Sequence, residues 1–381
     1  MACICLRFTG RPRLDPDDSE LIIDTHCHLA LTRRKVDDSI ERFSLEPQGA
    51  RAFPGYDSYL SDRMLGSILW RFLRWKLGIG GRLKPGEEMD AAIMKMNERH
   101  LLDTPSVDRF VMLAFDEYHT ADGEAVGPPR PGGGNGSDMY SSNSFVRHVC
   151  RQHPEKLLFC ASIHPYRPGA LEALEEVNEA GAVMIKWLPV HQNIDAGDAR
   201  VAAFMRRAGE LKLPMLIHYG SEMALRRNHR DQMNPAPMLE LLGRLKGEGR
   251  LPTVIIAHVA AWAVPWSVGP HARRLIDALL HQFADDPVYA DISALTNKPG
   301  AITHIRRRPE LHDKLVYGSD FPIPPGLWGF PWLWPKSGRI KASPSWPEQT
   351  YRLIRALGFD DSIFKRGYDI LRHRIESPTN R

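Results

Sequence analysis

Residues 182–218 read AVMIKWLPVHQNIDAGDARVAAFMRRAGELKLPMLIH, and this stretch holds the repeating unit that decides the fold. It begins with one apolar run, AVMIKWL, and ends with another, LPMLIH. Between them, the segment VAAFMRRAGELK at 201–212 has the pattern of a helix. Continuous apolar runs are typical of parallel strands that are covered on both faces. The stretch therefore predicts a strand, a crossover helix and a second, parallel strand.

The same alternation continues on both sides of this stretch. Helical patterns recur at 170–181 (ALEALEEVNEAG) and at 271–283 (HARRLIDALLHQF). Eight apolar runs predict strands, at 21–24, 109–115, 156–163, 182–188, 213–218, 252–258, 287–293 and 314–320. Eight strands that alternate with helices predict an α/β fold of the (β/α)8 TIM barrel type. An open doubly wound sheet is the competing fold, but it would not bring the first and last strands together.

The chain has more residues than such a barrel needs. It contains 381 residues, whereas the barrel typically takes about 250. We expect the surplus of roughly 130 residues in loops, mainly in a long insertion after the first strand at about 30–105. A second place is the Gly- and Pro-rich tract at 121–142, which predicts an irregular loop. The expected organisation is a tail at 1–19 and a single barrel domain over 20–381.

The composition is that of a globular protein and excludes several other classes. Apolar residues make up 43% and charged residues 25% of the chain, and no apolar stretch reaches the roughly 20 residues of a membrane-spanning helix. The net charge of +4 is spread along the chain, so it does not indicate nucleic acid. We expect a small-molecule substrate and no transmembrane segment, with a homo-oligomer left open. Five cysteines without a disulfide framework predict reduced thiols and a cytoplasmic location.

Ionisable side chains that can bind a metal ion or act in catalysis occur where several predicted strands end. The first run leads into Asp24-Thr25-His26-Cys27-His28. Because residues two apart on a strand face the same side, His26 and His28 can face the barrel axis together. Alone this pair is weak, since sixteen histidines produce such pairs by chance. The other runs carry further polar side chains at or near their ends: His164, Lys186, His218, His258 and Asp320.

These strand ends are expected to meet at one face of the barrel. TIM-barrel active sites lie at the carboxyl ends of the strands. Strand eight lies beside strand one in a closed barrel, so we expect Asp320 next to His26 and His28. Three neutral imidazoles and a carboxylate, with one coordination position open, are typical of a catalytic site for zinc or a similar divalent ion. The sequence therefore predicts a metal-dependent enzyme, with zinc as the favoured ion.

With these residues in place, the chain resembles the metal-dependent amidohydrolase superfamily. The resemblance is to its amidohydrolase-related (amidohydrolase 2) branch, which also includes decarboxylases of aromatic acids. The matching stretches are in the family's order and are DTHCHL, SIHPYRPGA, MIKWLP with QNID following, LPMLIHYGSE, VIIAH, YADISAL and VYGSDFPIP. The resemblance implies a distorted (β/α)8 barrel, with His258 as a catalytic residue. It implies four metal ligands, which are His26, His28, His218 and Asp320.

The sequence departs from the family pattern near the substrate pocket. After His218 the chain has Tyr219-Gly220, where the family often has Thr-Gly or Cys-Gly. The segment VAAWAVPW after His258 lacks a glycine that is often present there. These departures leave the metal ligands intact and put the family's substrate pocket in doubt.

Lys186 has two alternative roles under this resemblance. In some branches the lysine at this position is carboxylated and bridges two metal ions. In the amidohydrolase-related branch one ion is commoner, and the lysine would then bind a substrate carboxylate or oxyanion. We favour one ion. Weaker candidates for substrate binding are His164, which is more typical of a structural residue, Glu222, more typical of a solvated loop, and Tyr166 and Arg167. Asp291 is expected to be a hydrogen-bonded residue at the barrel rim.

The expected reaction is hydrolysis of a C–N or C–O bond in a small anionic or aromatic substrate. A divalent metal would supply hydroxide near neutral pH, and Asp320 would take the proton and deliver it to the leaving group. His258 would hydrogen-bond the attacking water or polarise the scissile carbonyl. The alternative is a decarboxylase or hydratase with the same ligands. A catalytically silent binding scaffold is the third alternative, and no expected ligand is missing to support it.

Two aromatic segments lie outside this framework. The stretch 59–78, within a predicted helix at 55–80, places Leu65, Leu69, Phe72 and Leu73 on one helical face, with arginines interleaved. A basic amphipathic helix can lie on a membrane surface, but a lid or subunit-contact helix at the mouth of the barrel is favoured. The aromatic residues of PPGLWGFPWLWP at 324–335 are expected to line the substrate pocket.

Overall fold

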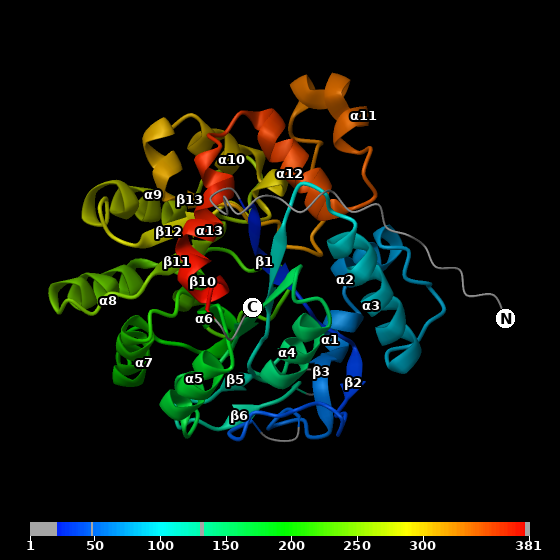
Figure 1. Ribbon diagram of the computed structural model, residues 1–381, viewed down its shortest axis with the longest axis vertical. Helices are drawn as coiled ribbons and strands as arrows, with labels where there is room; N and C mark the ends of the chain where they lie inside the picture. Colours follow the sequence, from blue (N-terminus) through cyan, green and yellow to red (C-terminus); the bar gives the residue numbers. More distant parts are fainter. Residues whose placement is uncertain (1–20, 47–48, 130–132, 378–381) are drawn as a thin grey trace.

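The computed structural model describes residues 21–46, 49–129 and 133–377 (Figure 1). The expected tail at 1–19 lies outside the described residues. A sheet of parallel strands occupies the centre of the molecule and helices surround it, as Figure 1 shows. No helix in the described part of the chain has both the length and the apolar composition that crossing a bilayer requires.

The central sheet has eight strands in the order β1-β4-β8-β9-β10-β11-β12-β13. Every neighbouring pair in this order is parallel. Each of the eight predicted apolar runs overlaps one of these strands, which confirms the strand prediction. The strands are β1 (Ile23–His28), β4 (Arg109–Leu113), β8 (Leu157–Ala161), β9 (Met184–Trp187), β10 (Met215–His218), β11 (Val254–Ala257), β12 (Val288–Asp291) and β13 (Leu315–Val316).

Hydrogen bonds between β1 and the chain after β13 close the sheet on itself. The backbone N–H of Thr25 donates to the carbonyl of Tyr317 (3.3 Å), and that of His28 donates to Phe321 (2.8 Å). The N–H of Asp320 donates in return to the carbonyl of His26 (2.9 Å). The first and last strands therefore meet, as a (β/α)8 barrel requires and an open doubly wound sheet does not. The predicted TIM-barrel class is confirmed.

The outer helices follow from amphipathic sequences with clear start and stop signals. At the start of α7 the Asp198 carboxylate accepts from the N–H of Arg200, and at the start of α12 the Ser345 hydroxyl accepts from Glu348. Gly358, with φ +79°, ends α12 in the left-handed region that favours glycine. These helices are α4 (Asn143–Gln152), α5 (Ala170–Glu179), α7 (Ala199–Glu210), α8 (Ala236–Gly247), α9 (Pro270–Asp277), α10 (Pro299–Arg306), α12 (Trp346–Leu357) and α13 (Ser362–Ile375).

The shorter elements lie in the connections between these units. They comprise two short α-helices, α6 (Pro189–Gln192) and α11 (Ser337–Ile340), and a π-helical turn at Ala278–Gln282 that continues α9. Single turns of 3-10 helix are at Arg230–Met233, His258–Ala260, Leu295–Asn297, Pro309–Lys314 and Pro331–Lys336. β5 (Tyr118–His119), just before the tract predicted as an irregular loop, forms a short antiparallel pair with β6 (Ala125–Val126) inside that tract.

The chain between β1 and β4 folds against one side of the barrel. We call residues 29–108 the connecting segment. It contains β2 (Arg33–Lys35), β3 (Tyr56–Leu60), α1 (Asp62–Leu65), α2 (Ile68–Lys76) and α3 (Glu87–Leu102). Its two strands join β7 (Met139–Ser141), which belongs to the loop after β4, in a small sheet of order β2-β3-β7. Both pairings in this small sheet are antiparallel.

One buried carboxylate attaches the connecting segment to the barrel. Glu117 follows β4, and its Oε2 accepts hydrogen bonds from the backbone N–H groups of Arg51 (2.7 Å) and Ala52 (3.1 Å). Its Oε1 accepts from the Tyr59 hydroxyl (2.9 Å). Glu117 is fully buried, and this burial raises the pKa of its carboxyl to about 7. The attachment therefore depends on a carboxyl group that titrates near neutral pH.

The prediction of one helix over 55–80 is wrong in part. Residues 56–60 form β3, and the rest divides into α1 and α2. Gly66 ends α1, and the Ser67 hydroxyl accepts from the N–H of Trp70 to begin α2. A serine next to a glycine thus starts a new helix instead of continuing the old one. The predicted apolar face is also wrong at Phe72, which is 41% exposed, whereas Leu73 is buried.

Candidate metal centre and active site

Two histidines of β1 face the inside of the barrel together. His26 is fully buried and His28 partly buried, and their Nε2 atoms are 3.2 Å apart. Cys27, between them, lies on the other side of the strand and is buried beside Ser319, with Sγ 3.7 Å from its hydroxyl. The alternation of a β-strand thus directs both imidazoles to one place.

Asp320 completes a triangle of donor atoms with this pair. Its Oδ1 is 3.4 Å from His26 Nε2 and 3.2 Å from His28 Nε2. Two ligands of a tetrahedral divalent ion, with bonds of about 2.0–2.2 Å, are roughly 3.3–3.6 Å apart. Burial alone would raise the pKa of Asp320, but its attraction to His258 and to the two histidines outweighs burial and holds that pKa below its usual range. The three donors therefore fit a divalent metal ion.

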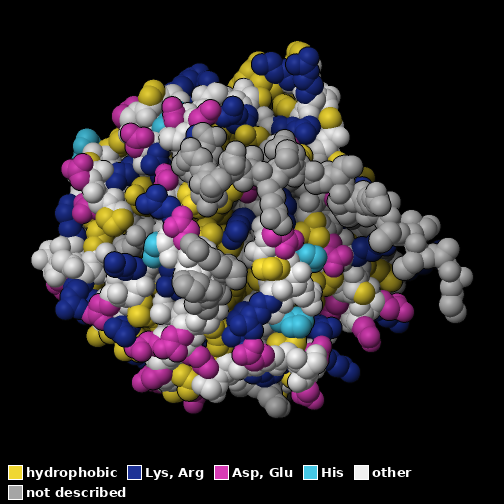
Figure 2. All heavy atoms as spheres, viewed as in Figure 1, with side chains coloured by type: hydrophobic (Ala, Val, Ile, Leu, Met, Phe, Trp, Pro, Cys, Tyr) yellow, Lys and Arg dark blue, Asp and Glu magenta, His cyan; other side chains and the backbone are white. Residues whose placement is uncertain are grey.

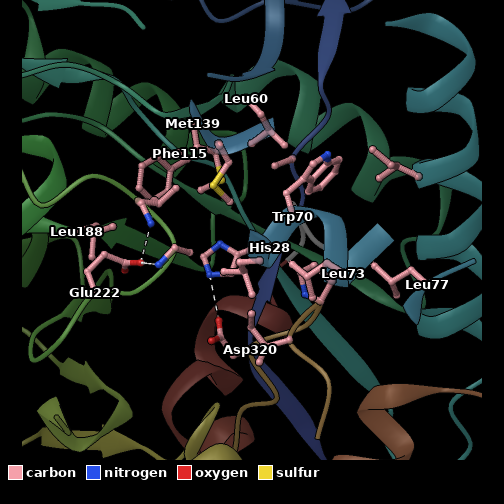
Figure 3. A pocket seen from close by; sticks show the side chains of 18 of the residues that line it. His28, Leu60, Trp70, Leu73, Leu77, Phe115, Met139, Leu188, Glu222 and Asp320 are labelled. Carbon is pink, nitrogen blue, oxygen red and sulfur yellow. Dashed lines mark hydrogen bonds and ion pairs between the residues drawn. The ribbon is translucent and has the colours of Figure 1, made fainter. Parts of the chain in front are cut away.

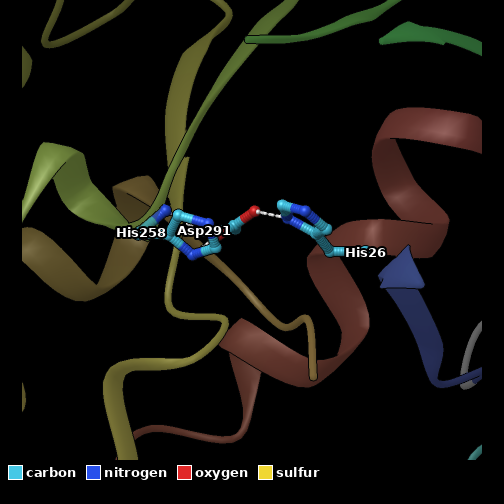
Figure 4. A group of neighbouring side chains, drawn as sticks. All are labelled: His26, His258 and Asp291. Carbon is cyan, nitrogen blue, oxygen red and sulfur yellow. Dashed lines mark hydrogen bonds and ion pairs between the residues drawn. The ribbon is translucent and has the colours of Figure 1, made fainter. Parts of the chain in front are cut away.

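Asp291 fixes which nitrogen of His26 faces the triangle. His26 Nδ1 is 2.8 Å from Asp291 Oδ2, as Figure 4 shows. Burial would raise the pKa of Asp291, but His26, through charge and its hydrogen bond, and His258 hold it below its usual range, so the carboxylate is ionised and can only accept. The proton of His26 is therefore on Nδ1 and its Nε2 lone pair is free. Burial, together with Lys186, lowers the pKa of His26 to about 3, which keeps the ring neutral, as a metal ligand must be.

Ser293 connects His258 to the same carboxylate. Its hydroxyl donates to Asp291 Oδ1 (2.5 Å) and lies 2.8 Å from His258 Nδ1. That nitrogen is also 2.9 Å from the carbonyl oxygen of Ser293. A carbonyl only accepts, so His258 carries its proton on Nδ1. The neutral form of this ring has its lone pair on Nε2, which lies 4.0 Å from Asp320 Oδ2.

His218 lies beside this triangle and is not part of it. Its ring contacts that of His258 edge to face, with centroids 4.8 Å apart. His218 Nε2 is buried and has no hydrogen-bond partner among the described residues, and the nearest carboxylate oxygen, Glu222 Oε2, is 3.7 Å away. Burial and the proximity of His258 lower the pKa of His218 well below its usual value. A neutral imidazole with a free buried nitrogen is available as a further ligand.

Two buried lysines approach the centre. Lys186, on β9, is 1% exposed, and its Nζ is 3.3 Å from His26 Nε2. Lys298, which begins α10, is 8% exposed and interacts electrostatically with Asp320, Glu222 and Asp291. Burial lowers the pKa of both amines. Sequence reasoning missed Lys298 because it lies in the loop after β12, away from the strand ends.

Positive backbone φ angles occur where two of these side chains leave their strands. Asp320 has a φ of +61°, and His258, Val259 and Ala260 have values of +55°, +51° and +49°. This region is uncommon for non-glycine residues and strongly disfavoured for a β-branched residue such as Val259. Strained backbone of this kind is concentrated at functional sites, where the surrounding structure holds it.

The three weaker candidates on the chain after β8 are engaged elsewhere. His164 Nε2 is 2.8 Å from the carbonyl oxygen of Gln192, and the Arg167 guanidinium donates to Asp116 Oδ2 (3.2 Å). The Tyr166 hydroxyl accepts from the N–H of Asp195 (2.9 Å). None of the three lines the cavity described below, whereas Glu222 does. A substrate role for His164, Tyr166 and Arg167 stays a prediction.

The candidate metal centre lies at one end of a cavity of about 150 Å³ (Figure 3). Lys186, Glu222 and Asp320 line it together with the histidines His28, His218 and His258. The tryptophans of 324–335 are about half exposed and do not line it, so the expectation that this segment lines the pocket is wrong. Trp70 and Phe115 are the cavity's aromatic residues. Figure 2 shows one face of the surface around the barrel, with charged and hydrophobic side chains interspersed.

The fold and these donors together define a class of protein. It is a TIM barrel with a candidate metal centre at the carboxyl ends of its strands. A family model described as Amidohydrolase (Amidohydro_2) matches residues 23–353. The chain therefore belongs to the amidohydrolase family, which confirms the resemblance seen in the sequence.

Among the solved structures compared with this chain, one reaches a TM-score of 0.50 and supports the fold alone, because its identity to this chain is low. An uncharacterized TIM-barrel protein from Bordetella bronchiseptica is 13% identical, covers 88% of this chain and 98% of its own, and has a TM-score of 0.50. A probable 2-pyrone-4,6-dicarboxylic acid hydrolase from Acinetobacter baumannii gives 14% identity, 92% and 99% coverage and a TM-score of 0.48. 5-Carboxyvanillate decarboxylase from Novosphingobium aromaticivorans is 12% identical, covers 96% of this chain and 98% of its own, and has a TM-score of 0.47. A comparison with curated proteins finds no match.

Asp291 and Ser293 show what sequence reasoning could have used. The sequence predicts Asp291 as a hydrogen-bonded rim residue, and the structure confirms its hydrogen bonds. Ser293 was missed, although its spacing of two residues from Asp291 places both on one side of the chain at the end of β12. Gly318 is a further missed position. A Cβ there would lie 3.0 Å from the Cβ of His26 and 3.2 Å from that of Ser293, so a larger residue would displace His26.

Proposed function

We propose that this protein is a metal-dependent hydrolase that cleaves a C–N or C–O bond of a small organic substrate. The observation that carries the proposal is the convergence of His26 Nε2, His28 Nε2 and Asp320 Oδ1 within 3.4 Å of one another at the end of a cavity. His218 supplies a fourth neutral donor nearby. We favour zinc and a single ion, with two ions if Lys186 is carboxylated.

The residues around this centre divide the catalytic work. When bound, a divalent metal lowers the pKa of water from 15.7 to about 7 and polarises a carbonyl oxygen. His258 Nε2, with its free lone pair, accepts a hydrogen bond from the attacking water and orients it. Asp320 Oδ2, 4.0 Å from that nitrogen, takes the proton and returns it to the leaving group. Lys186 Nζ stabilises the oxyanion or an anionic group of the substrate.

The hydrolase proposal is tested with Asp320→Asn. The protein is loaded with zinc and assayed against panels of amides, esters and lactones. For the substrate found, Asp320→Asn is expected to lower kcat by about 10²–10⁴-fold and to retain metal on the histidines. Asp277→Asn, an exposed carboxylate on α9, is the matched control and should keep full activity. Near-normal turnover by metal-loaded Asp320→Asn would contradict the assigned proton path.

A decarboxylase or hydratase is the second candidate function. Lys186 favours it, because this buried amine lines the cavity and can pair with a substrate carboxylate beside the metal ligands. Incubation with a panel of aromatic and related acids distinguishes the two reactions. Release of CO₂, or gain or loss of water, without cleavage of any amide, ester or lactone would replace the hydrolase assignment with a lyase.

Metal analysis separates both enzymes from a silent binding scaffold. We expect about one equivalent of divalent ion in protein purified without added metal, and loss of activity with chelators. Substoichiometric metal together with no effect of chelators would favour the scaffold, and two equivalents would favour a carboxylated Lys186. We also propose a cytoplasmic location, because Cys27, Cys150 and Cys160 are buried free thiols. Cell fractionation tests it.

A further inference from the structure

The lining of the cavity divides by origin into two ends (Figure 3). Histidines, Lys186, Glu222 and Asp320 line one end and come from the strands of the barrel and the loops that follow them. The connecting segment supplies the other end, where the lining is almost entirely apolar. Its side chains include Leu60, Met64, Trp70, Leu73, Ile93 and Met96. We call this end the apolar arm.

The apolar arm has no charged group with which a polar ligand could pair. The only polar lining residue from the connecting segment is Asn97, whose side-chain amide has no hydrogen-bond partner among the described residues. A carboxylate or a polyhydroxylated body placed here would lose its hydration without compensation, which is strongly unfavourable. An apolar body would instead gain free energy in proportion to the area that it buries. The arm therefore selects for an apolar group.

The volume of the cavity limits the size of this group. At about 150 Å³ it equals an engineered protein cavity that binds benzene. Because this volume includes the end at the candidate metal centre, the corresponding occupant is the whole substrate, with one aromatic ring or a straight chain of about six to eight carbons. Trp70 and Leu73 of α2 face this space, whereas Ile68 at the start of the same helix is 84% exposed. One helix thus has an inner face that contacts the occupant and an outer face that does not.

We propose that the substrate has a single polar reactive head and an apolar aryl or alkyl body, and that the body binds in the apolar arm. The position of the head at the candidate metal centre rests on the function proposed above. The position of the body rests on the apolar lining, most of which the connecting segment supplies. Asn97 offers a hydrogen bond to at most one polar substituent on that body.

A chain-length series tests the proposal on the protein itself. Binding of straight-chain carboxamides, from butanamide to dodecanamide, is measured by calorimetry on zinc-loaded and on metal-stripped protein. We expect the affinity to rise about three- to fourfold for each added methylene up to roughly six to eight carbons, and then to level off or fall. The same dependence should be present in both metal states. An affinity that does not change with chain length would overturn the proposal.

Two variants on α2 locate the binding site. Leu73→Trp fills the apolar arm and is expected to weaken octanamide binding by at least about tenfold, with much less effect on butanamide. Ile68→Trp places the same side chain on the exposed face and should leave the whole series unchanged. Equal effects of both variants would overturn the assignment. If Leu73→Trp does not fold, the chain-length series on the unmodified protein decides.

Turnover separates this proposal from the proposed function. Chain-length-dependent binding without any reaction would leave the apolar arm standing and contradict the hydrolase. Hydrolysis of short polar substrates, with no preference for an apolar body, would leave the hydrolase standing and contradict the apolar arm.

Discussion

The strand ends of the barrel and the connecting segment form the same cavity by different physical means. At the strand ends hydrogen bonds hold two of the imidazoles, because Asp291 holds His26 and Ser293 holds His258. In the connecting segment the lining side chains are held by packing, with Leu60, Leu73 and Ile93 buried among other apolar groups. Under the proposals above, the first region would determine the reaction and the second the choice of substrate. The same difference explains why only the strand ends can be recognised in the sequence as a motif.

The largest effect is expected at the strand ends, from His26→Ala. This change removes one corner of the donor triangle, so the protein should lose its bound metal and with it activity, by more than the 10–100-fold typical of the residues that support a ligand. Metal content and kcat/KM measured on the same preparation check the result. Ile68→Trp, already the control for α2, should keep both. Full metal content in His26→Ala would exclude His26 as a ligand.

Asp291→Asn tests the hydrogen bond behind the ligand. The amide keeps the size of the carboxylate, but its NH₂ group can only donate to His26 Nδ1. The proton of His26 would then move to Nε2, the nitrogen that faces the triangle. We expect metal affinity to fall by about 10–100-fold without loss of the fold. Competition with a chelator of known affinity measures it, and an unchanged affinity would show that the tautomer is set by another group.

Glu117→Gln tests the junction between the two regions. The carboxyl of Glu117 has an ordinary pKa of 4.5 and a pKa of about 7 in the folded protein. Between these values the folded state holds a proton that the unfolded chain has released, so the free energy of unfolding falls as pH rises from about 5 to 7.5. The loss amounts to at most about 3 kcal/mol. Glutamine does not titrate, and its oxygen can still accept from the N–H groups of Arg51 and Ala52, whereas its NH₂ group must donate to the Tyr59 oxygen.

Urea unfolding at several pH values measures this difference. Other titrating groups are common to both proteins, so their effects largely cancel when the two curves are subtracted. Glu117→Gln should therefore gain stability relative to the unmodified protein as pH rises from 5 to 7.5. Parallel curves for the two proteins would mean that the Glu117 carboxyl is ionised throughout this range.

The smallest effect is expected in the apolar arm, from Ile93→Val. The change removes one methylene from the wall of the cavity, and a lost methylene contact reduces the affinity for the substrate body by about two- to fourfold. Since Ile93 is proposed to contact the substrate body and takes no part in the proton transfer, KM should rise with kcat nearly unchanged. Steady-state kinetics with an octyl or phenyl substrate measures both constants. A drop in kcat with constant KM would place Ile93 in the reactive region instead.

The fold was predictable from the sequence because parallel strands buried on both faces leave a continuous apolar signal. Runs such as 252–258 mark β11 within two residues at each end, and the same signal places His258 and His218 at strand ends. The donor triangle was predictable for a related reason. The alternation of side chains along β1 and the closure of the barrel bring His26, His28 and Asp320 together, independently of the conformation of the loops.

The connecting segment was not predictable to the same degree, because its conformation depends on tertiary contacts. The sequence pattern predicts a helix at residues 56–60, but these residues form β3 because they pair with β2 and β7. The tryptophans of 324–335 carry the same apolar signal as Trp70, but only Trp70 lines the cavity. Lys298 comes from a loop, where no periodic pattern in the sequence predicts which way a side chain points.

The small sheet β2-β3-β7 limits how this barrel can be recombined with its relatives. β3 pairs with β7 from beyond β4, and the Arg51 and Ala52 amides depend on Glu117 from the same loop. A chimera that imports residues 29–108 alone would have an edge strand without its neighbour and two backbone N–H groups without their acceptor. Under the proposal that the apolar arm selects the substrate, substrate preference would depend on a discontinuous module of two segments. A single crossover would divide that module, and laboratory exchange of substrate preference needs 29–108 and 114–142 to move together.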